Sequence, residues 1–164
     1  LALAAVMVLG LMIVGAGAVG VDDFTDADEI TNREAVSVLT SLGVITGKDD
    51  GSYDPSGTIT RAEMTTIICR ILNGGTDPQL GSSVTNTFSD TVSHWASGYI
   101  EFCVTRGIVA GRGDGTFDPD GTVTVAEGAK MMLVALGYNA SVEGLTGSNW
   151  QINTDVLANQ KGLY

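Results

Sequence analysis

Residues 43–63, with the sequence GVITGKDDGSYDPSGTITRAE, recur without a gap as residues 107–127, with the sequence GIVAGRGDGTFDPDGTVTVAE. The offset is 64 residues, and weaker matches extend it over residues 24–72 and 88–136. The identical positions of the central stretch are Gly43, Gly47, Asp50, Gly51, Asp54, Pro55, Gly57, Thr58, Thr60, Ala62 and Glu63. Because an ungapped match of this density marks a repeated structural unit, the chain is predicted to consist of tandem repeats.

Each repeat is predicted to fold as a helix, a loop and a second helix, because apolar residues recur at helical spacing on both sides of the loop. The predicted helices span residues 32–42, 61–72, 94–106 and 125–136. Gly43 and Gly107 follow the first helix of each repeat, where glycine readily takes the left-handed conformation that ends a helix. The apolar segments 44–46 and 108–110 favour no more than a pair of strand residues, so the predicted fold class is all-α.

The starts and buried faces of these helices have their own signals. A Thr or Ser followed three residues later by Glu is typical of a capping box. The predicted boxes pair Thr31 with Glu34, Thr60 with Glu63, and Thr124 with Glu127. The helix over residues 61–72 is predicted to bury Met64, Ile67, Ile68, Ile71 and Leu72, and Trp95 is expected in the buried stripe of the helix over 94–106.

A third repeat is predicted to begin near the end of the sequence. Trp95 precedes Gly107 by twelve residues, and Trp150 precedes Gly162 by the same number. The segment between the first two repeats is rich in Gly, Ser, Thr and Asn, which is typical of a linker. The predicted organisation is repeat one over residues 22–73, a linker over 74–87, repeat two over 88–138, and the start of a truncated repeat three over 145–164.

The first 21 residues carry no charge and are almost entirely apolar. Such a run can serve as the apolar core of an export signal, and Ala16-Gly17-Ala18 has the form of a cleavage site. Residues 1–18 are therefore predicted to be a signal peptide whose own start is truncated. A retained membrane anchor and a buried core helix are the alternatives.

The charge of the chain excludes two classes of partner. Nineteen acidic residues against eight basic ones give a formal net charge of −11. A nucleic-acid binder needs a basic footprint, and docking on anionic lipid needs one as well. Contact with a membrane is therefore expected only through the signal segment during export.

No pattern of the sequence points to catalysis, a metal or a cofactor. His94 is the only histidine, so neither a Ser triad nor a Cys triad has its base, and we expect His94 to pack at a helix start. Asp118, Asp120, Gly121 and Glu127 fit the register of a calcium loop, but Thr116 stands at its first position, so turn-forming acids are the favoured interpretation. The chain is predicted not to be an enzyme.

Cys69 and Cys103 match no metal-binding or redox motif. Buried free thiols are the favoured interpretation. A disulfide between them is the alternative, since an exported chain meets an oxidising environment.

Arg61 is the residue that helix formation does not explain. It follows the predicted cap Thr60, so its cation stands at the positive end of the helix dipole, which costs a few tenths of a kcal/mol. An anion that binds both Arg61 and the free amides of the helix start would account for this placement. In the second repeat Val125 replaces the arginine, so that repeat keeps the cap without the cation.

Taken together, these motifs resemble the surface-layer homology (SLH) repeat. The matching residues are Phe88-Ser89-Asp90, His94-Trp95-Ala96, Tyr99-Ile100, Gly107-Ile108-Val109-Ala110-Gly111, Asp114 through Gly121, and Thr124 with Ala126-Glu127. The first repeat matches less well at Ile30-Thr31 and better at Thr60-Arg61-Ala62-Glu63. The resemblance covers residues 24–164 and implies a bundle in which three repeats are related by a pseudo-threefold axis.

The resemblance also implies a function. Grooves between SLH repeats bind a secondary cell-wall polysaccharide, and its pyruvate ketal often meets the motif arginine, which here can only be Arg61. By the same resemblance, the polysaccharide-binding residues of this chain are expected to be Arg61, Thr60, Glu63, Asp26, Asp90, Trp95 and Trp150. The chain is thus expected to be secreted to the cell wall and to anchor an exported protein there non-covalently. The alternative is a protein–protein module by which surface-layer proteins assemble.

Overall fold

A computed structural model of the chain describes residues 19–79 and 85–164. The predicted signal peptide, residues 1–18, lies outside the described residues, as do residues 80–84 of the predicted linker. Within the described ranges the secondary structure is helical and contains no strand, which confirms the all-α class. The segments 44–46 and 108–110 are both described by the structure and form no strand, and an isolated antiparallel bridge joins Thr60 to Thr122.

The chain divides into two compact units, of which the first ends at Ser56. This unit contains two 3-10 helices, Val21–Asp23 and Ala27–Glu29, and helix α1, Arg33–Ser41. Phe24, Ile30 and Val36 form its small apolar core.

The capping box predicted at Thr31 and Glu34 is wrong, because α1 takes Asn32 as its N-cap and has no side-chain cap. The guanidinium of Arg33 instead donates to the carbonyl oxygen of Ala27 and pairs with the carboxylate of Asp22. Contacts from outside the helix therefore fix the entry of the chain into α1.

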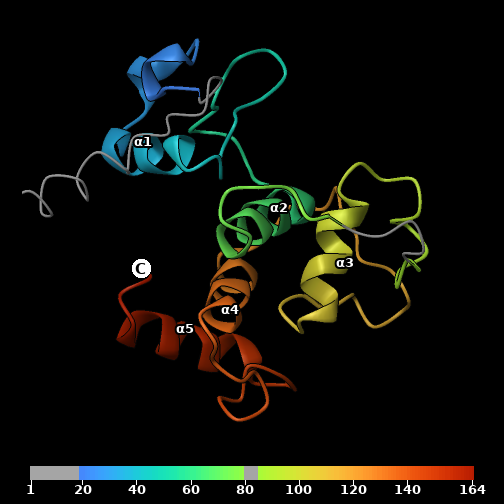
Figure 1. The fold of residues 1–164 in the computed structure, drawn as a ribbon. Coiled ribbons are helices and arrows are strands. Elements are labelled where there is room, and N and C mark those ends of the chain that lie inside the picture. Colours follow the sequence, from blue (N-terminus) through green and yellow to red (C-terminus); the bar gives the residue numbers. More distant parts are fainter. Residues whose placement is uncertain (1–18, 80–84) are drawn as a thin grey trace, which may run out of the picture. The chain divides into compact units, whose positions relative to one another are not determined.

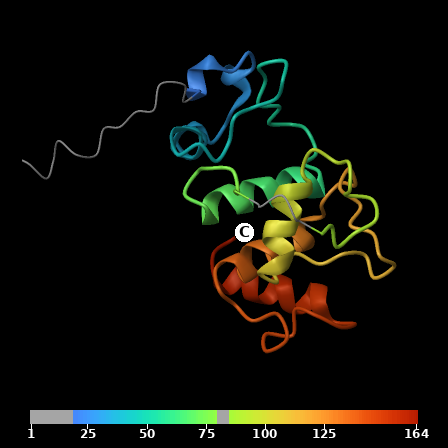
Figure 2. The same cartoon turned by 45° about the vertical axis from the view of Figure 1, so that its right-hand side comes forward.

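The second unit, Gly57–Tyr164, contains the other four α-helices. They are α2, Arg61–Leu72; α3, Ser97–Thr105; α4, Val125–Ala135; and α5, Trp150–Gln160. Helix α2 packs against α3 and α4, and α4 packs against α5 (Figures 1 and 2). The last helix of one sequence repeat thus pairs with the first helix of the next repeat.

Both capping boxes of the second unit are present as predicted. The amide of Thr60 donates to Glu63 Oε2 over 2.8 Å, and the amide of Glu63 donates to Thr60 Oγ1 over 3.2 Å. The same pair of bonds joins Thr124 and Glu127 over 2.9 and 3.2 Å. Two of the orphan amides at each helix start are satisfied in this way.

Helix α3 begins three residues later than predicted. The Nδ1 atom of His94 accepts the amide of Ala96 over 3.1 Å, so the histidine folds back on the turn that precedes the helix. Trp95 belongs to this turn and is 60% exposed, so its assignment to the buried stripe is wrong. The turn carries the indole away from the core that Ile100 and Cys103 enter.

The buried face of α2 also differs from the predicted one. Ile71 and Leu72 are exposed, whereas Ala62, Thr65 and Cys69 are fully buried. Small side chains allow α2 to approach α3 closely, and Cys103 Sγ lies 3.7 Å from the carbonyl oxygen of Thr65. Close helix packing, rather than maximal apolarity, therefore selects the face that is buried.

None of the helices in the described parts of the chain is both long and apolar enough to cross a membrane.

Candidate functional site

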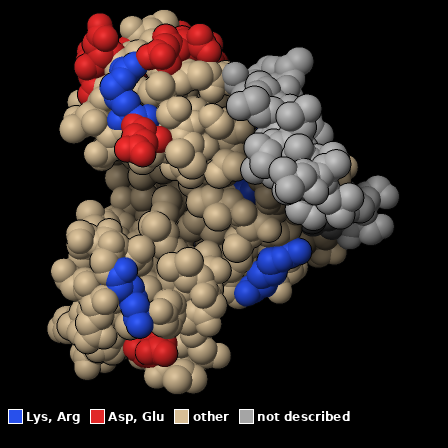
Figure 3. Space-filling view, turned by 60° about the vertical axis from the view of Figure 1, so that its left-hand side comes forward, with Lys and Arg blue, Asp and Glu red and all other residues tan. Residues whose placement is uncertain are grey.

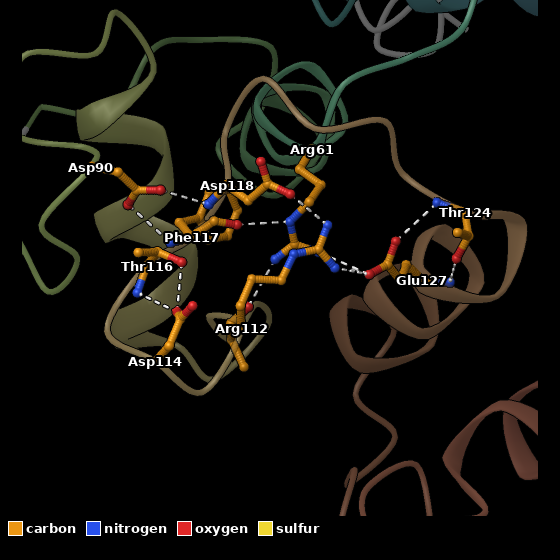
Figure 4. A network of polar contacts seen from close by, with 10 residues as sticks. Arg61, Asp90, Arg112, Asp114, Thr116, Phe117, Asp118, Thr124 and Glu127 are labelled. Carbon is orange, nitrogen blue, oxygen red and sulfur yellow. Dashed lines mark hydrogen bonds and ion pairs between the residues drawn. The ribbon is translucent and has the colours of Figure 1, made fainter.

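The loop over residues 111–119 is held by a carboxylate from an earlier turn. Asp90 accepts the amides of Phe117 and Asp118 over 2.9 and 2.8 Å (Figure 4). Asp118 has a φ of 61°, a left-handed conformation that aspartate tolerates better than most residues. Desolvation of this carboxylate opposes its ionisation, but the two amide bonds lower the pKa of Asp90 below its usual value. Asp90 is thus a structural anchor of the loop.

Asp26 does the same for the loop over residues 47–55 in the first unit. It accepts the amides of Tyr53 and Asp54 over 2.8 and 2.6 Å. Asp54, at the position equivalent to that of Asp118, also has a positive φ, of 58°. The bond from Tyr53 is the main cause of the lowered pKa of Asp26.

Arg61 inserts into the loop of the other repeat. Its side chain is almost completely buried, and the guanidinium lies 4.5 Å from the centre of the Phe117 ring. Arg61 Nε donates to the carbonyl oxygen of Phe117 over 2.9 Å, and Nη2 donates to that of Ala110 over 3.0 Å. Burial and then the charge of Arg112 lower the pKa of Arg61, but an arginine stays protonated. The structure therefore gives Arg61 a role inside the fold, which the sequence did not reveal.

The amides at the start of α2 are occupied as well. The amide of Arg61 donates to the carbonyl oxygen of Gly121, and that of Ala62 donates to the carbonyl oxygen of Pro119, both over 2.9 Å. The expected sharing of an anion between Arg61 and free helix-start amides is thus replaced by contacts within the chain. At the equivalent start of α4, the side chain of Val125 is 75% exposed.

Glu127 joins the start of α4 to two arginines (Figure 4). Its Oε1 atom pairs with Arg112 Nη1 and, over 3.4 Å, with Arg61 Nη1, while Oε2 accepts the Thr124 amide. Burial opposes ionisation, but the Thr124 amide and Arg112 lower the pKa of Glu127. Glu127 is therefore an anionic centre to which both guanidinium groups bind.

Arg112 and Lys130 extend the cluster toward solvent. Arg112 Nη2 lies 3.0 Å from Asp118 Oδ2, and about a third of the arginine side chain is exposed. Lys130 Nζ lies 5.1 Å from the centre of the Trp150 ring. Burial and then the charge of Arg61 lower the pKa of Lys130, so the two cations are close enough to repel each other. We call Arg61, Arg112 and Lys130 the cationic cluster.

The predicted site residues are thus only partly brought together. Arg61 and Asp90 act on one loop, and Trp150 reaches the cationic cluster through Lys130. Thr60 and Glu63 form a helix cap. Trp95 is exposed beside His94 and Tyr99, at ring-centroid distances of 5.4 and 6.3 Å. Asp26 belongs to the other compact unit.

Sequence reasoning missed Arg112 and Lys130. A signal for Arg112 existed, because Lys48 occupies the same position of the first repeat, so both loops carry a cation there. No comparable signal marked Lys130, whose position in the first repeat holds Thr66. Glu127 was recognised as a capping residue, but its pairing with the two arginines was not predicted.

Comparisons with known proteins agree with this architecture. The S-layer homology domain matches residues 23–65 and 87–127. The Middle cell wall protein of Brevibacillus brevis is 35% identical over 114 residues, which cover 69% of this chain and 11% of that protein. The S-layer protein EA1 of Bacillus anthracis is 34% identical over 110 residues, which cover 67% of this chain and 12% of that protein.

The Cellulosome-anchoring protein of Acetivibrio thermocellus is 32% identical over 98 residues, 60% of this chain and 22% of that protein. The chain therefore spans about a tenth to a quarter of the length of these relatives.

Cell-wall, surface-layer and cell-surface proteins recur among the relatives of this chain, which confirms the expected location at the cell surface. The family match covers about half of the chain, and it falls on the two repeats recognised in the sequence. The chain belongs to the S-layer homology (SLH) domain family.

Proposed function

We propose that this chain anchors an exported protein non-covalently to the bacterial cell wall by binding an anionic secondary cell-wall polysaccharide. The observation that carries the proposal is the cationic cluster of Arg61, Arg112 and Lys130 around Glu127. Three of the eight basic residues of a chain with net charge −11 gather there. A local excess of donors is what an acidic protein needs in order to bind an anionic polymer.

The distribution of charge supports a local site rather than a long-range field. The first 56 residues carry a formal net charge of −7 and the remaining residues −4. On the face shown in Figure 3 the acidic side chains gather mainly on the N-terminal unit, and the basic side chains are scattered. Attraction of an anionic polymer must therefore come from short-range contacts, and its salt dependence should be mild.

Arg112 and Lys130 are the cations we assign to direct contact with the polymer. The Nη atoms of Arg112 bind Glu127 and Asp118, but a guanidinium has five N–H donors, and the side chain is partly exposed. A carboxylate such as that of a pyruvate ketal fits the planar donor geometry of arginine. Arg61 adds its positive charge from its buried position beneath the loop surface, and it holds the Phe117 carbonyl in place.

The other predicted site residues are assigned supporting or stacking roles. Trp150 and the exposed Trp95 offer flat faces on which a sugar ring can pack. Asp26 and Asp90 shape the loops. Thr60 and Glu63 fix the start of α2 and hence the position of Arg61.

A sedimentation assay with purified cell-wall sacculi tests the proposal. The chain should sediment with sacculi that carry the polysaccharide and stay in solution when the polymer has been stripped by acid. Arg112→Gln should weaken binding about tenfold or more, since it removes a charge-assisted contact. Lys48→Gln is the matched control, because it removes a cation from the equivalent loop position outside the cluster, and it should bind within about twofold of the unchanged chain.

Equal sedimentation with both kinds of sacculi would refute polysaccharide binding. Self-association of the chain in the absence of sacculi would favour the alternative, a module for protein–protein assembly. Equal losses for Arg112→Gln and Lys48→Gln would show that net charge, rather than the cationic cluster, determines binding.

A further inference from the structure

Cys69 of α2 and Cys103 of α3 face each other in the core of the second unit. Both side chains are fully buried and belong to the same apolar cluster. Cys103 Sγ donates to the carbonyl oxygen of Thr65 over 3.7 Å. That carbonyl lies one helical turn before Cys69, and in an α-helix it also accepts the Cys69 amide. Both cysteines are free thiols in the structure, and they are adjacent across the interface between α2 and α3.

In the equivalent helix pair, α4 and α5, the residues at these two positions are buried in one apolar cluster. The Cys69 position of α2 corresponds to Leu133 of α4, since both stand nine residues after the capping threonine. The Cys103 position corresponds to Ala158 of α5, because both carbonyls accept the amide five residues on, over 2.9 and 3.0 Å. Leu133 and Ala158 are both fully buried in one cluster.

In α4 and α5 the interface is thus filled by a large and a small apolar side chain, whereas in α2 and α3 it is filled by two thiols. A disulfide requires two cysteines on closely approaching backbones, and the small side chains of α2 let this helix approach α3 closely. We propose that Cys69 and Cys103 form a disulfide that links α2 to α3 in the mature protein at the cell surface.

The bond forms by thiol–disulfide exchange with a disulfide-bearing oxidant, either a small molecule or an exported oxidoreductase. One cysteine thiolate attacks the oxidant, which releases one reduced sulfur, and the second cysteine then displaces the other. Two protein thiols and one oxidant disulfide thus give one protein disulfide and two oxidant thiols. Both thiols are fully buried in the folded chain, so the oxidant reaches them before the core closes.

The consequence is a covalent closure of the segment between residues 69 and 103. This segment contains the linker between the repeats, whose conformational freedom in the unfolded chain the bond would reduce. The link would hold α2, and with it Arg61, against the second repeat without any contact to the polysaccharide. It is therefore independent of the proposed function.

The test is to refold the reduced, denatured chain in a glutathione redox buffer, then denature it and alkylate it with a maleimide. We expect a product that takes up no label and is about 2 Da lighter than the dithiol form. Its thermal midpoint should lie about 10 °C above that of the same chain kept in dithiothreitol.

The double variant Cys69→Leu/Cys103→Ala, which copies the equivalent pair of α4 and α5, is the control. It should fold and show the same midpoint with and without dithiothreitol. Two labelled thiols in a chain that has folded in the redox buffer would overturn the proposal. A disulfide that leaves the midpoint unchanged or lowers it would overturn it as well, because the bond would then oppose the native packing.

Discussion

The loops over residues 47–55 and 111–119 have the same internal bonds but different surroundings. In each, an earlier aspartate, Asp26 or Asp90, accepts two successive loop amides. In each, an aromatic side chain packs on an earlier phenylalanine, at ring-centroid distances of 5.6 and 5.5 Å. The backbone of the loop is therefore determined locally, by residues of its own repeat.

The difference lies in what reaches the loop from outside. The second loop receives the guanidinium of Arg61, and its Phe117 is fully buried. Tyr53, at the same position of the first loop, is only partly buried, and no arginine among the described residues stacks on it. The motif arginine of the first repeat therefore completes the loop of the second repeat.

The largest effect should come from Arg61→Ala, compared with a change of Val125 at the equivalent position of α4. Arg61→Ala removes a buried hydrogen bond to the Phe117 carbonyl oxygen, a second bond to the Ala110 carbonyl oxygen and one partner of Glu127, so the second unit should lose about 3 kcal/mol of unfolding free energy. Val125→Ala changes the equivalent but exposed position of α4 and should cost less than about 0.5 kcal/mol. Urea denaturation followed by tryptophan fluorescence measures both, since Trp95 and Trp150 lie in that unit.

This prediction also revises what the sequence suggests for Arg61. If it contacted only the polysaccharide, Arg61→Ala would weaken wall binding with little change in stability. A loss of stability below about 0.5 kcal/mol would therefore contradict the buried role of the side chain.

An intermediate effect is expected when the caps of α2 and α4 are compared. Thr60→Ala and Thr124→Ala each remove one side-chain acceptor from a helix start and should each cost about 1 kcal/mol, measured by the same urea titration. Serine at either position keeps the acceptor and should restore most of the loss. A loss confined to one of the two variants would show that the starts of α2 and α4 are not equivalent.

The smallest effect concerns the aspartates that hold the loops. The folded-state pKa of Asp90 lies below the ordinary value of 3.8, so its carboxylate stabilises the fold above that pH. The contribution is lost as the pH falls through the folded-state pKa. Asp90→Asn should lower stability at pH 7 by less than about 1 kcal/mol, because the group is largely exposed.

The same variant should flatten the fall of the thermal midpoint between about pH 4 and pH 2. Asp26→Asn should act in the same direction in the first unit, because the pKa of Asp26 is lowered by equivalent bonds. An unchanged pH profile for both variants would show that other carboxylates dominate acid unfolding.

Local signals in the sequence predicted the helices well. Both ends of α2 were predicted to the residue, because the capping box of Thr60 and Glu63 and the apolar spacing act within one segment. The start of α1 was predicted wrongly, because Arg33 is held by Asp22 and Ala27, outside the helix. Signals that a residue receives from its own turn can be read from sequence, and those from a neighbouring turn are easily missed.

The partners of Arg61 could not be predicted from local signals in the sequence. Its main acceptor, the carbonyl oxygen of Phe117, is 56 residues away, and no local pattern encodes that contact. The sequence singled out Arg61 correctly as a cation without a local explanation, but it could not tell an internal carbonyl from an external anion. Lys130 was missed for a similar reason, because only the fold brings it to Trp150.

Because α2 of the first sequence repeat packs on α3 of the second, the repeated stretch of sequence is not the same as the compact unit that folds. A chimaera joined within residues 74–87, between two sequence repeats, would carry α2 and Arg61 away from the loop they complete. A junction at Ser56 and Gly57 would instead exchange whole compact units. Recombination among genes of this family should therefore tolerate crossovers after the loop better than crossovers in the linker.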